Sequence, residues 1–491
     1  MENVSKSNFK DGLLVIMERN KNPTAVSQGR QNNLASTTEK MLQKSSIYAI
    51  SQVGKSKSLS RRFLWIVVLI AALSGCSYEI YKFLMHYFLY PVVINLLIQN
   101  NEYLPFPAVT VCGLNRMKKE YMPCLGTNRP IKNCTDGPSN SLSGAGEFGV
   151  SASERIGIAR CQSQLSGKTD HTKSKFGKFV NKYSHSDSER RRLFDVTAKE
   201  FIDACSFDQQ HCSFENFSLF QNLHYGNCFT FNKILNNSSS VRSHKVGVKS
   251  GLTLVIELNP TQDIPVSQSS GVKVVIHHSV DDPNPEDGIS VAPGQETSFS
   301  IKQVITRRLP PPYKDRCMDY TNMYRGRDEC ILFCIQEQNY ASCSCIDPTL
   351  PHINDWPRCN INNVNDSCCL DNVLGNMTKK ELPCDCPLPC EMISYKIIKS
   401  AALWPSRSSY LKSMSLSNRS LTEIRLSKTR IQIYYSTLEQ KVFEQKAVFQ
   451  NSELFSHLGS ELGLWLGLSL AAAFELMENI IHLFRYCLTK H

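Results

Sequence analysis

The sequence predicts an α+β membrane protein in which two transmembrane helices flank a large, disulfide-rich extracellular β domain with peripheral helices. Two long apolar segments lie near the two ends of the 491-residue chain, and crossing a bilayer takes about 20 apolar residues. All but two of the 20 cysteines lie between these segments, the exceptions being Cys76 and Cys487. Acceptor sequences for N-linked glycans lie in the same interval, at Asn133, Asn216, Asn236, Asn237, Asn365, Asn376 and Asn418.

Basic residues beside the apolar segments predict the orientation of the chain. Lys55, Lys57, Arg61 and Arg62 precede the first segment and Arg485 follows the second, and basic residues mark cytoplasmic ends. We therefore expect a plasma-membrane protein with both termini in the cytoplasm. The expected parts are a cytoplasmic tail at 1–60, a first transmembrane helix at 61–86, an extracellular domain at 87–453, a second transmembrane segment at 454–484 and a short cytoplasmic tail at 485–491.

A cleaved signal peptide is disfavoured for the first segment. More than 60 residues precede its apolar run, and no small-residue cleavage site follows it. Asn3 also lies in a glycosylation acceptor sequence, but a cytoplasmic tail would not be glycosylated.

The cysteines between the apolar segments indicate disulfides. Their number is even, and an extracellular compartment is oxidising. Cys-x-Cys repeats could instead hold zinc, but zinc ligands would have to remain reduced, so we expect no metal and no cofactor. The net charge of +11 is spread over loop and tails and does not argue for nucleic acid binding.

Alternation of apolar and polar residues predicts strands in the extracellular part, at 252–258, 272–280, 297–304 and 430–435, with a turn at Pro293-Gly294. Cys330 and Cys334 lie one turn apart on one expected helix face, so a helix can be linked covalently to the edge of this β domain.

The second apolar segment is more than a hydrophobic anchor. Gly459, Gly463 and Gly467 recur every fourth residue, which leaves one helix face without side chains, and Ser456, Ser460 and Ser469 add small hydroxyls. Such a face lets helices or ions approach the backbone. Glu475 lies deep in the segment, where an ionisable residue usually faces a bundle interior or water. The alternative is an anchor whose glycine face only packs against other helices.

Four motifs together resemble the degenerin/epithelial sodium channel family, to which acid-sensing channels belong. They are the Gly467-Leu468-Ser469 tract, residues 106–112 (Phe-Pro-Ala-Val-Thr-Val-Cys), residues 226–232 (Gly-Asn-Cys-Phe-Thr-Phe-Asn) and residues 435–441 (Tyr-Ser-Thr-Leu-Glu-Gln-Lys). The resemblance covers nearly the whole chain.

This resemblance implies a subunit of a trimeric, sodium-preferring cation channel that is ligand-gated and amiloride-sensitive. Its partners would be Na⁺, related subunits in a homo- or heterotrimer, membrane lipid and an extracellular ligand. Gly467, Leu468 and Ser469 would form the selectivity filter. The pore and gate would contain Ser456, His457, Ser460, Gly463 and Glu475, and an aromatic contact between Tyr90 and Tyr313 would couple the ectodomain to gating.

The resemblance also implies disulfide pairings and subdomains. The pairs would be Cys112 with Cys228, Cys205 with Cys212, Cys317 with Cys390, Cys330 with Cys386, Cys334 with Cys384, Cys345 with Cys359, and Cys343 with Cys368 or Cys369. The partners of Cys124, Cys134 and Cys161 cannot be deduced. A finger at about 115–215 would include Arg190-Arg191-Arg192, which we interpret as a solvated charged surface rather than a docking patch. A thumb would occupy about 309–395.

The sequence departs from the family at two places. Tyr48-Ala49 stands where most members carry a His-Gly pair that influences gating, and Pro91 and Val92 replace the paired histidines of acid-sensing members. The gating stimulus therefore stays open. The main alternative function is a non-conducting auxiliary subunit or cysteine-rich surface receptor. An enzyme is disfavoured because no nucleophile, base and acid recur at a known spacing. Cys487 is either palmitoylated or an inert thiol.

Overall fold

The computed structural model contains two compact units. The helical unit consists of the chain up to Pro91 and from Ala447 onward, and the disulfide-rich unit is Val92–Lys446. The structure describes residues 43, 45, 47–126, 134, 179–234, 240–264, 267, 269–320, 326–351, 355–379, 384–413 and 419–488. The glycosylation predictions at Asn3, Asn133, Asn236, Asn237 and Asn418, and Cys161, lie outside these residues.

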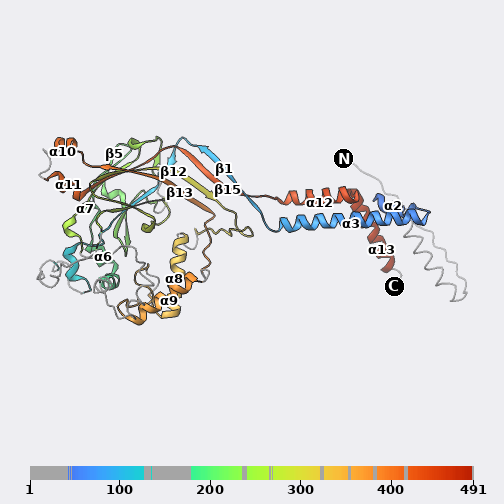
Figure 1. Ribbon diagram of the computed structural model, residues 1–491, viewed down its shortest axis with the longest axis horizontal. Helices are drawn as coiled ribbons and strands as arrows, with labels where there is room; N and C mark the ends of the chain where they lie inside the picture. Colours follow the sequence, from blue (N-terminus) through green and yellow to red (C-terminus); the bar gives the residue numbers. More distant parts are fainter. Residues whose placement is uncertain are drawn as a thin grey trace, which may run out of the picture. The chain divides into compact units, whose positions relative to one another are not determined.

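The disulfide-rich unit is built on two main β-sheets (Figure 1). The larger sheet has the order β1 (Val92–Asn100), β15 (Glu439–Ala447), β12 (Gln295–Arg307), β14 (Lys428–Tyr435), β9 (Leu252–Glu257), β4 (Ile202–Phe207) and β5 (Gln210–Cys212), with β13 (Glu391–Leu403) also paired to β12. The second has the order β11 (Ile289–Val291), β10 (Val272–His277), β3 (Ala108–Gly113), β7 (Gly226–Phe231) and β6 (Phe217–Asn222). A short pair joins β2 (Leu104–Pro105) to β8 (Arg242–Ser243).

One hydrophobic core draws on strands of both main sheets. Leu254 of β9, Phe299 of β12 and Ile433 of β14 are fully buried in it together with Val109 and Val111 of β3. Burial alternates along β9 and β12 because successive side chains point to opposite faces of a sheet. The four predicted strands are thereby confirmed as β9, β10, β12 and β14. Gly294 forms the expected turn before β12, with a φ of 74°.

Helices accompany the sheets, with 4 to 17 residues in each α-helix. The α-helices of this unit are α6 (Ser188–Phe194), α7 (Ala198–Phe201), α8 (Arg327–Cys343), α9 (Val364–Lys379), α10 (Arg407–Ser413) and α11 (Leu421–Ser427). The 3₁₀ helices are η1 (Lys119–Cys124), η3 (Phe214–Asn216), η4 (Val248–Ser250), η5 (Pro260–Gln262) and η6 (Pro285–Asp287).

Disulfides join α8 and α9 to the chain around them. In the described residues the pairs are Cys112–Cys228, Cys124–Cys134, Cys205–Cys212, Cys317–Cys390, Cys330–Cys386, Cys334–Cys384, Cys343–Cys369 and Cys345–Cys359. Apart from Cys124–Cys134, these are the pairings that the family resemblance implied. The structure selects Cys369 for Cys343, and Cys368 is disulfide-bonded as well.

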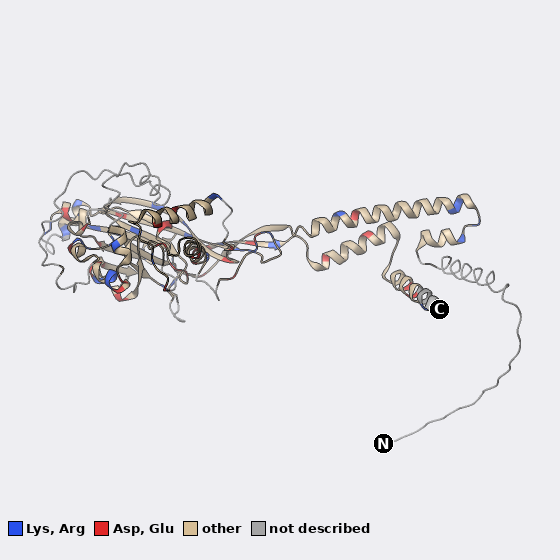
Figure 2. Ribbon diagram, turned by 90° about the horizontal axis from the view of Figure 1, so that it is seen from below, with Lys and Arg blue, Asp and Glu red and all other residues tan. Residues whose placement is uncertain are grey.

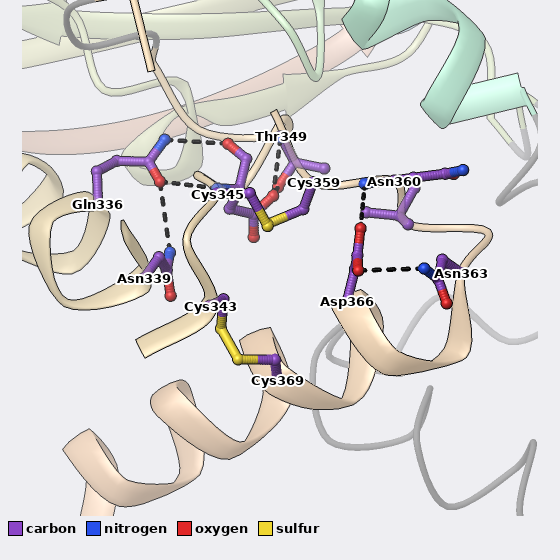
Figure 3. The surroundings of a disulfide bond; sticks show 12 residues. Gln336, Asn339, Cys343, Cys345, Thr349, Cys359, Asn360, Asn363, Asp366 and Cys369 are labelled. Carbon is purple, nitrogen blue, oxygen red and sulfur yellow. Dashed lines mark hydrogen bonds between the residues drawn. A yellow bond between two sulfur atoms is a disulfide. The ribbon is translucent and has the colours of Figure 1, made fainter. Parts of the chain in front are cut away.

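A buried amide reinforces the disulfides around α8 (Figure 3). Gln336 of α8 is fully buried, and its Nε2 donates to the carbonyls of Asp347 at 3.0 Å and Pro351 at 3.1 Å. Its Oε1 accepts the Asp347 N–H at 2.9 Å. An amide inside a protein is stable only when its donors and acceptors are paired, so Gln336 fixes the loop after α8 to the helix.

The interpretation of Arg190-Arg191-Arg192 as a solvated surface is wrong at Arg191. Only 8% of this residue is exposed, and its guanidinium donates to the carbonyls of Ser184 and Ser186. The Ser184 carbonyl lies in the last turn of the helical residues 179–185 and the Ser186 carbonyl directly follows them, and carbonyls at a helix end attract basic side chains. Arg192 stays exposed, so the two neighbours have different roles.

The helical unit contains α2 (Tyr48–Lys55), α3 (Leu59–Tyr87), α12 (Asn451–Leu466) and α13 (Leu470–Leu488). Charged residues are few along α3 and α12 (Figure 2). In the described part of the chain, α3 alone is long and apolar enough to cross a membrane as a single helix. The α12 helix and residues Leu470–Glu478 meet the same criterion when taken together, but they are bent by 76°.

Candidate functional site

The candidate site lies in the helical unit, where α3 and α12 run side by side in opposite directions (Figure 1). Near one end of the pair, Phe83 of α3 stacks on His457 of α12 with ring centroids 4.3 Å apart. Near the same end, the Tyr87 hydroxyl donates to Asn451 Oδ1 at 3.0 Å. His457 is therefore placed against α3.

A glycine permits the close approach of the two helices farther along. A Cβ added at Gly75 would lie 2.6 Å from Cζ3 of the Trp465 indole, so only glycine fits against this ring. The indole Nε1 donates to Glu461 Oε2 at 3.1 Å, one turn earlier in α12. Sequence reasoning missed this contact because a single glycine in an apolar run does not indicate which side chain will cover it.

The α12 helix ends inside the Gly467-Leu468-Ser469 tract. Gly467 adopts the left-handed conformation, with φ of 62° and ψ of 28°, which costs an L-residue about 1–2 kcal/mol but glycine almost nothing. The Gly467 N–H donates to the Gly463 carbonyl at 3.0 Å, and the Leu468 N–H donates to the Leu462 carbonyl at 3.2 Å. A left-handed glycine with two such hydrogen bonds is a common C-terminal cap of an α-helix.

Ser469 begins the next helix. Its hydroxyl accepts the Ala472 N–H at 3.2 Å, and its carbonyl accepts the Ala473 N–H at 3.0 Å. A serine at this position satisfies one of the N–H groups that lack a partner within the helix. The tract thus separates α12 from α13 within the expected second transmembrane segment at 454–484, whose crossing of the membrane stays a prediction.

The break brings a particular electrostatic arrangement to the tract. Beyond the Leu462 and Gly463 carbonyls, which accept the two N–H groups described above, the last carbonyls of a helix have no partner within it, and the C-terminal end of a helix carries a partial negative charge. Carbonyl and hydroxyl oxygens are the groups that replace the hydration shell of an alkali cation. The tract therefore places carbonyl and hydroxyl oxygens, the ligand type that such cations use, at one point of an otherwise apolar segment.

The other residues that we expect to line the pore lie on either side of the break. Ser456 and Ser460 are exposed on α12, and a Cβ added at Gly459 or Gly467 would meet no described atom within 4 Å. Glu475 of α13 is half-buried, and with Glu478 and Arg485 it lines an open hollow of about 770 Å³. Within the described part of one chain, the glycine face is thus open for approach.

The two residues of the expected gating contact belong to different units. Tyr90 follows α3, with a φ of 48°, and its N–H donates to the Tyr87 carbonyl at 3.1 Å. Tyr313 lies in the disulfide-rich unit, where its N–H donates to the Pro310 carbonyl at 3.3 Å. Their mutual contact stays a prediction.

A buried carboxyl that sequence reasoning missed lies beside α6. Asp195 is 3% exposed and accepts the backbone N–H groups of Val196, at 2.7 Å, and Asn227. Burial raises the pKa of Asp195 to about 7, although these two hydrogen bonds act in the opposite direction. Gly226, with a φ of 76°, leaves the space that the carboxyl occupies. An acidic residue between two short helices carries no sequence signal for such burial.

An apolar helix long enough to cross a membrane, a bent helix pair and a disulfide-rich β unit agree with the class of protein that the sequence motifs resemble. The chain belongs to the amiloride-sensitive sodium channel family, whose family model matches residues 41–478.

Relatives of this chain include degenerins and an epithelial channel subunit. Degenerin deg-1 of Caenorhabditis elegans is 30% identical over 357 residues, which are 68% of this chain and 46% of the degenerin. Epithelial sodium channel subunit alpha of Xenopus laevis is 26% identical over 500 residues, covering 88% of this chain and 79% of that subunit. The chain spans about half the length, or less, of several degenerins that it matches.

A solved structure of a proton-activated chloride channel aligns over 85% of this chain and 96% of that chain. The TM-score is 0.32 and the identity 7%, which is too low to support an argument about fold or ion.

Proposed function

We propose that the chain is a subunit of a trimeric, sodium-preferring cation channel of the plasma membrane, ligand-gated and amiloride-sensitive. In this proposal α3 and the broken α12–α13 pair are its two transmembrane segments, both termini are cytoplasmic, and the disulfide-rich unit is extracellular, with a finger at about 115–215 and a thumb at about 309–395. The observation that carries the proposal is the helix break at Gly467-Leu468-Ser469 within an apolar segment.

Three copies of the tract would form a narrow ring around the ion path. The backbone carbonyls and the Ser469 hydroxyl would replace part of the hydration shell of Na⁺, and the absence of bulky side chains would keep the ring open. The half-buried Glu475 on α13 would lower the energy of cations relative to anions on the cytoplasmic side of the ring. The open glycine face of α12 leaves room for neighbouring subunits or for ions.

The glycosylation sites within the described residues are compatible with an extracellular location. Asn216, Asn365 and Asn376 are exposed. The first lies at the end of η3 and the other two lie on α9.

The test combines whole-cell recording of the chain expressed alone with substitution of Ser469. Aspartate caps a helix as well as serine does, so Ser469→Asp keeps α13 intact while adding one carboxylate per subunit to the proposed ring. We expect it to change the sodium-to-potassium permeability ratio or to block conduction. Ser469→Cys tests the same position with a weaker acceptor, because sulfur is a poor hydrogen-bond partner.

Glu475→Gln serves as the comparison at a second depth. It should reduce the conductance while leaving the ring geometry in place. If both Ser469 variants reach the surface, carry current and keep the wild-type reversal potential under bi-ionic conditions, the filter lies elsewhere and the tract only ends a helix.

The second candidate is a non-conducting auxiliary subunit or surface receptor with the same ectodomain. It is favoured by Tyr48-Ala49 in place of the family's His-Gly pair. Tyr48 packs edge-on against Trp65 of α3, with ring centroids 5.4 Å apart. In this candidate the contact holds α2 against α3, so that the segment no longer moves in gating. Current from the chain expressed alone would exclude this candidate.

A further inference from the structure

A cavity of about 220 Å³ lies in the helical unit between α2, α3 and the end of α12. Its aromatic lining consists of Tyr48 from α2, Trp65 from α3 and Trp465 from α12. Two small residues, Ala49 and Ala72, are also part of the lining. The Tyr48 and Trp65 rings contact each other, with centroids 5.4 Å apart.

The lining is almost entirely apolar. No charged side chain contributes to it, and its polar side-chain groups are the Tyr48 hydroxyl and the indole N–H groups of Trp65 and Trp465. The indole N–H of Trp465 already donates to Glu461, at 3.1 Å, so it is not available to a ligand. The cavity is half-open, since Tyr48 and Trp465 are 64% and 40% exposed. For comparison of size, an enclosed engineered apolar cavity of about 150 Å³ binds benzene.

We propose that this cavity binds a small, uncharged aromatic molecule. By proportion to the benzene-binding cavity of about 150 Å³, it accommodates about six to nine non-hydrogen atoms. Three aromatic walls favour an aromatic ligand over an aliphatic one, since aromatic rings attract each other beyond the effect of area burial. An ionised ligand is excluded, because no opposite charge would offset its desolvation.

The position of the cavity gives the bound molecule a consequence for conduction. Leu466 and Gly467, at the end of α12 and the start of the helix break, form part of its wall. A ligand that fits one arrangement of this wall better than another shifts the equilibrium toward it. This consequence rests on the proposed channel function, whereas binding itself does not.

Binding is measured with bromobenzene, whose bromine quenches tryptophan fluorescence on contact. The full-length chain is placed in nanodiscs of dioleoylphosphatidylcholine, and its emission is followed as bromobenzene is added. Bromobenzene dissolved in the lipid quenches in proportion to its concentration, whereas occupancy of a cavity beside Trp65 and Trp465 saturates. We expect a saturable component above the linear background.

Two alanines that follow one another in α3 provide matched variants. Ala72 lines the cavity and Ala71 is exposed on another face. Ala72→Leu fills the space and should abolish the saturable component, while Ala71→Leu, with the same added volume, should retain it. Ala49→Leu fills the cavity from α2, so it replaces Ala72→Leu if that variant does not fold.

A quenching curve that is linear throughout, or a saturable component unaffected by both cavity-filling variants, overturns the proposal. A second result would also overturn it: phosphatidylcholine brominated on its acyl chains quenches the fluorescence, but bromobenzene gives no saturable component. A lipid chain would then occupy the cavity. A channel that conducts without saturable quenching would refute only this inference. Saturable quenching in a chain that carries no current would support it and refute the proposed channel function.

Discussion

Substituting Gly75 tests the packing that holds the candidate site together. In Gly75→Ala the new methyl group would lie 2.6–3.0 Å from three carbons of the Trp465 ring, whereas carbon atoms pack at about 3.5–4.0 Å. The indole must therefore move by about 1 Å, against its hydrogen bond to Glu461. Overpacking of this kind costs about 1–3 kcal/mol, and alanine returns about 1 kcal/mol of helix propensity. We expect a net loss of about 1 kcal/mol.

The assay is the apparent Tm of the purified full chain in detergent, compared among three variants. Gly75→Ala should lower the Tm, and adding Trp465→Phe should restore it, because a smaller ring relieves the overlap. Gly375→Ala in α9 is the control for propensity, since no described atom lies within 4 Å of its new methyl group, and it should not lower the Tm. The reasoning is refuted if Gly75→Ala is as well tolerated as Gly375→Ala, or if Trp465→Phe adds its own loss without interaction.

Four further predictions concern gating, the break and pH. Gly467→Ala should impair the current more than Gly467→Asn does. Asparagine is larger than alanine, but it tolerates the left-handed conformation that Gly467 adopts at a φ of 62°. The opposite order in recordings would mean that side-chain volume matters more than backbone conformation. Ser456→Phe should give constitutive inward current, and a variant that reaches the surface but is silent under every stimulus would contradict this. Tyr90→Ala and Tyr313→Ala should be non-additive in activation, with a coupling of about 0.5–1.5 kcal/mol if the rings touch; additive effects would remove the contact from the mechanism. Burial raises the pKa of Asp195 to about 7 in the folded protein. The folded state therefore gains stability from the neutral carboxyl, fully below about pH 4, and loses it as the pH rises through 7. Asp195→Asn should flatten the decline of the Tm between pH 4 and 8, and an unchanged slope would show that this carboxyl does not cause the decline.

The local alternation of apolar and polar residues was sufficient to predict the four strands named above. Leu252, Leu254 and Ile256 alternate with polar or half-buried residues, and all three are buried in β9. A period of two residues follows from the geometry of one strand and needs no knowledge of its neighbours. The β13 strand went unpredicted, because its tail carries no clear alternation and it is held by pairing with β12, whose last residue, Arg307, lies opposite Glu391.

At the candidate site, the sequence identified the residues but not their conformation. The recurring glycines and Ser469 were visible as small residues in an apolar segment, and their composition predicted a site of close approach. Residue type alone did not show that Gly467 adopts a positive φ and that Ser469 caps a new helix. The same residues are compatible with an unbroken helix, because each costs it only about 1 kcal/mol or less.

Tertiary structure alone decided the contacts between segments distant in the chain. Gly75 and Trp465 lie far apart in the sequence, and neither residue indicates by itself that the Trp465 ring packs against the backbone of Gly75. The burial of Arg191 and Asp195 likewise depends on carbonyl and N–H groups that other segments bring to them. Composition and periodicity report the environment that one segment prefers, whereas close contacts and buried polar pairs are set by the positions of several segments at once.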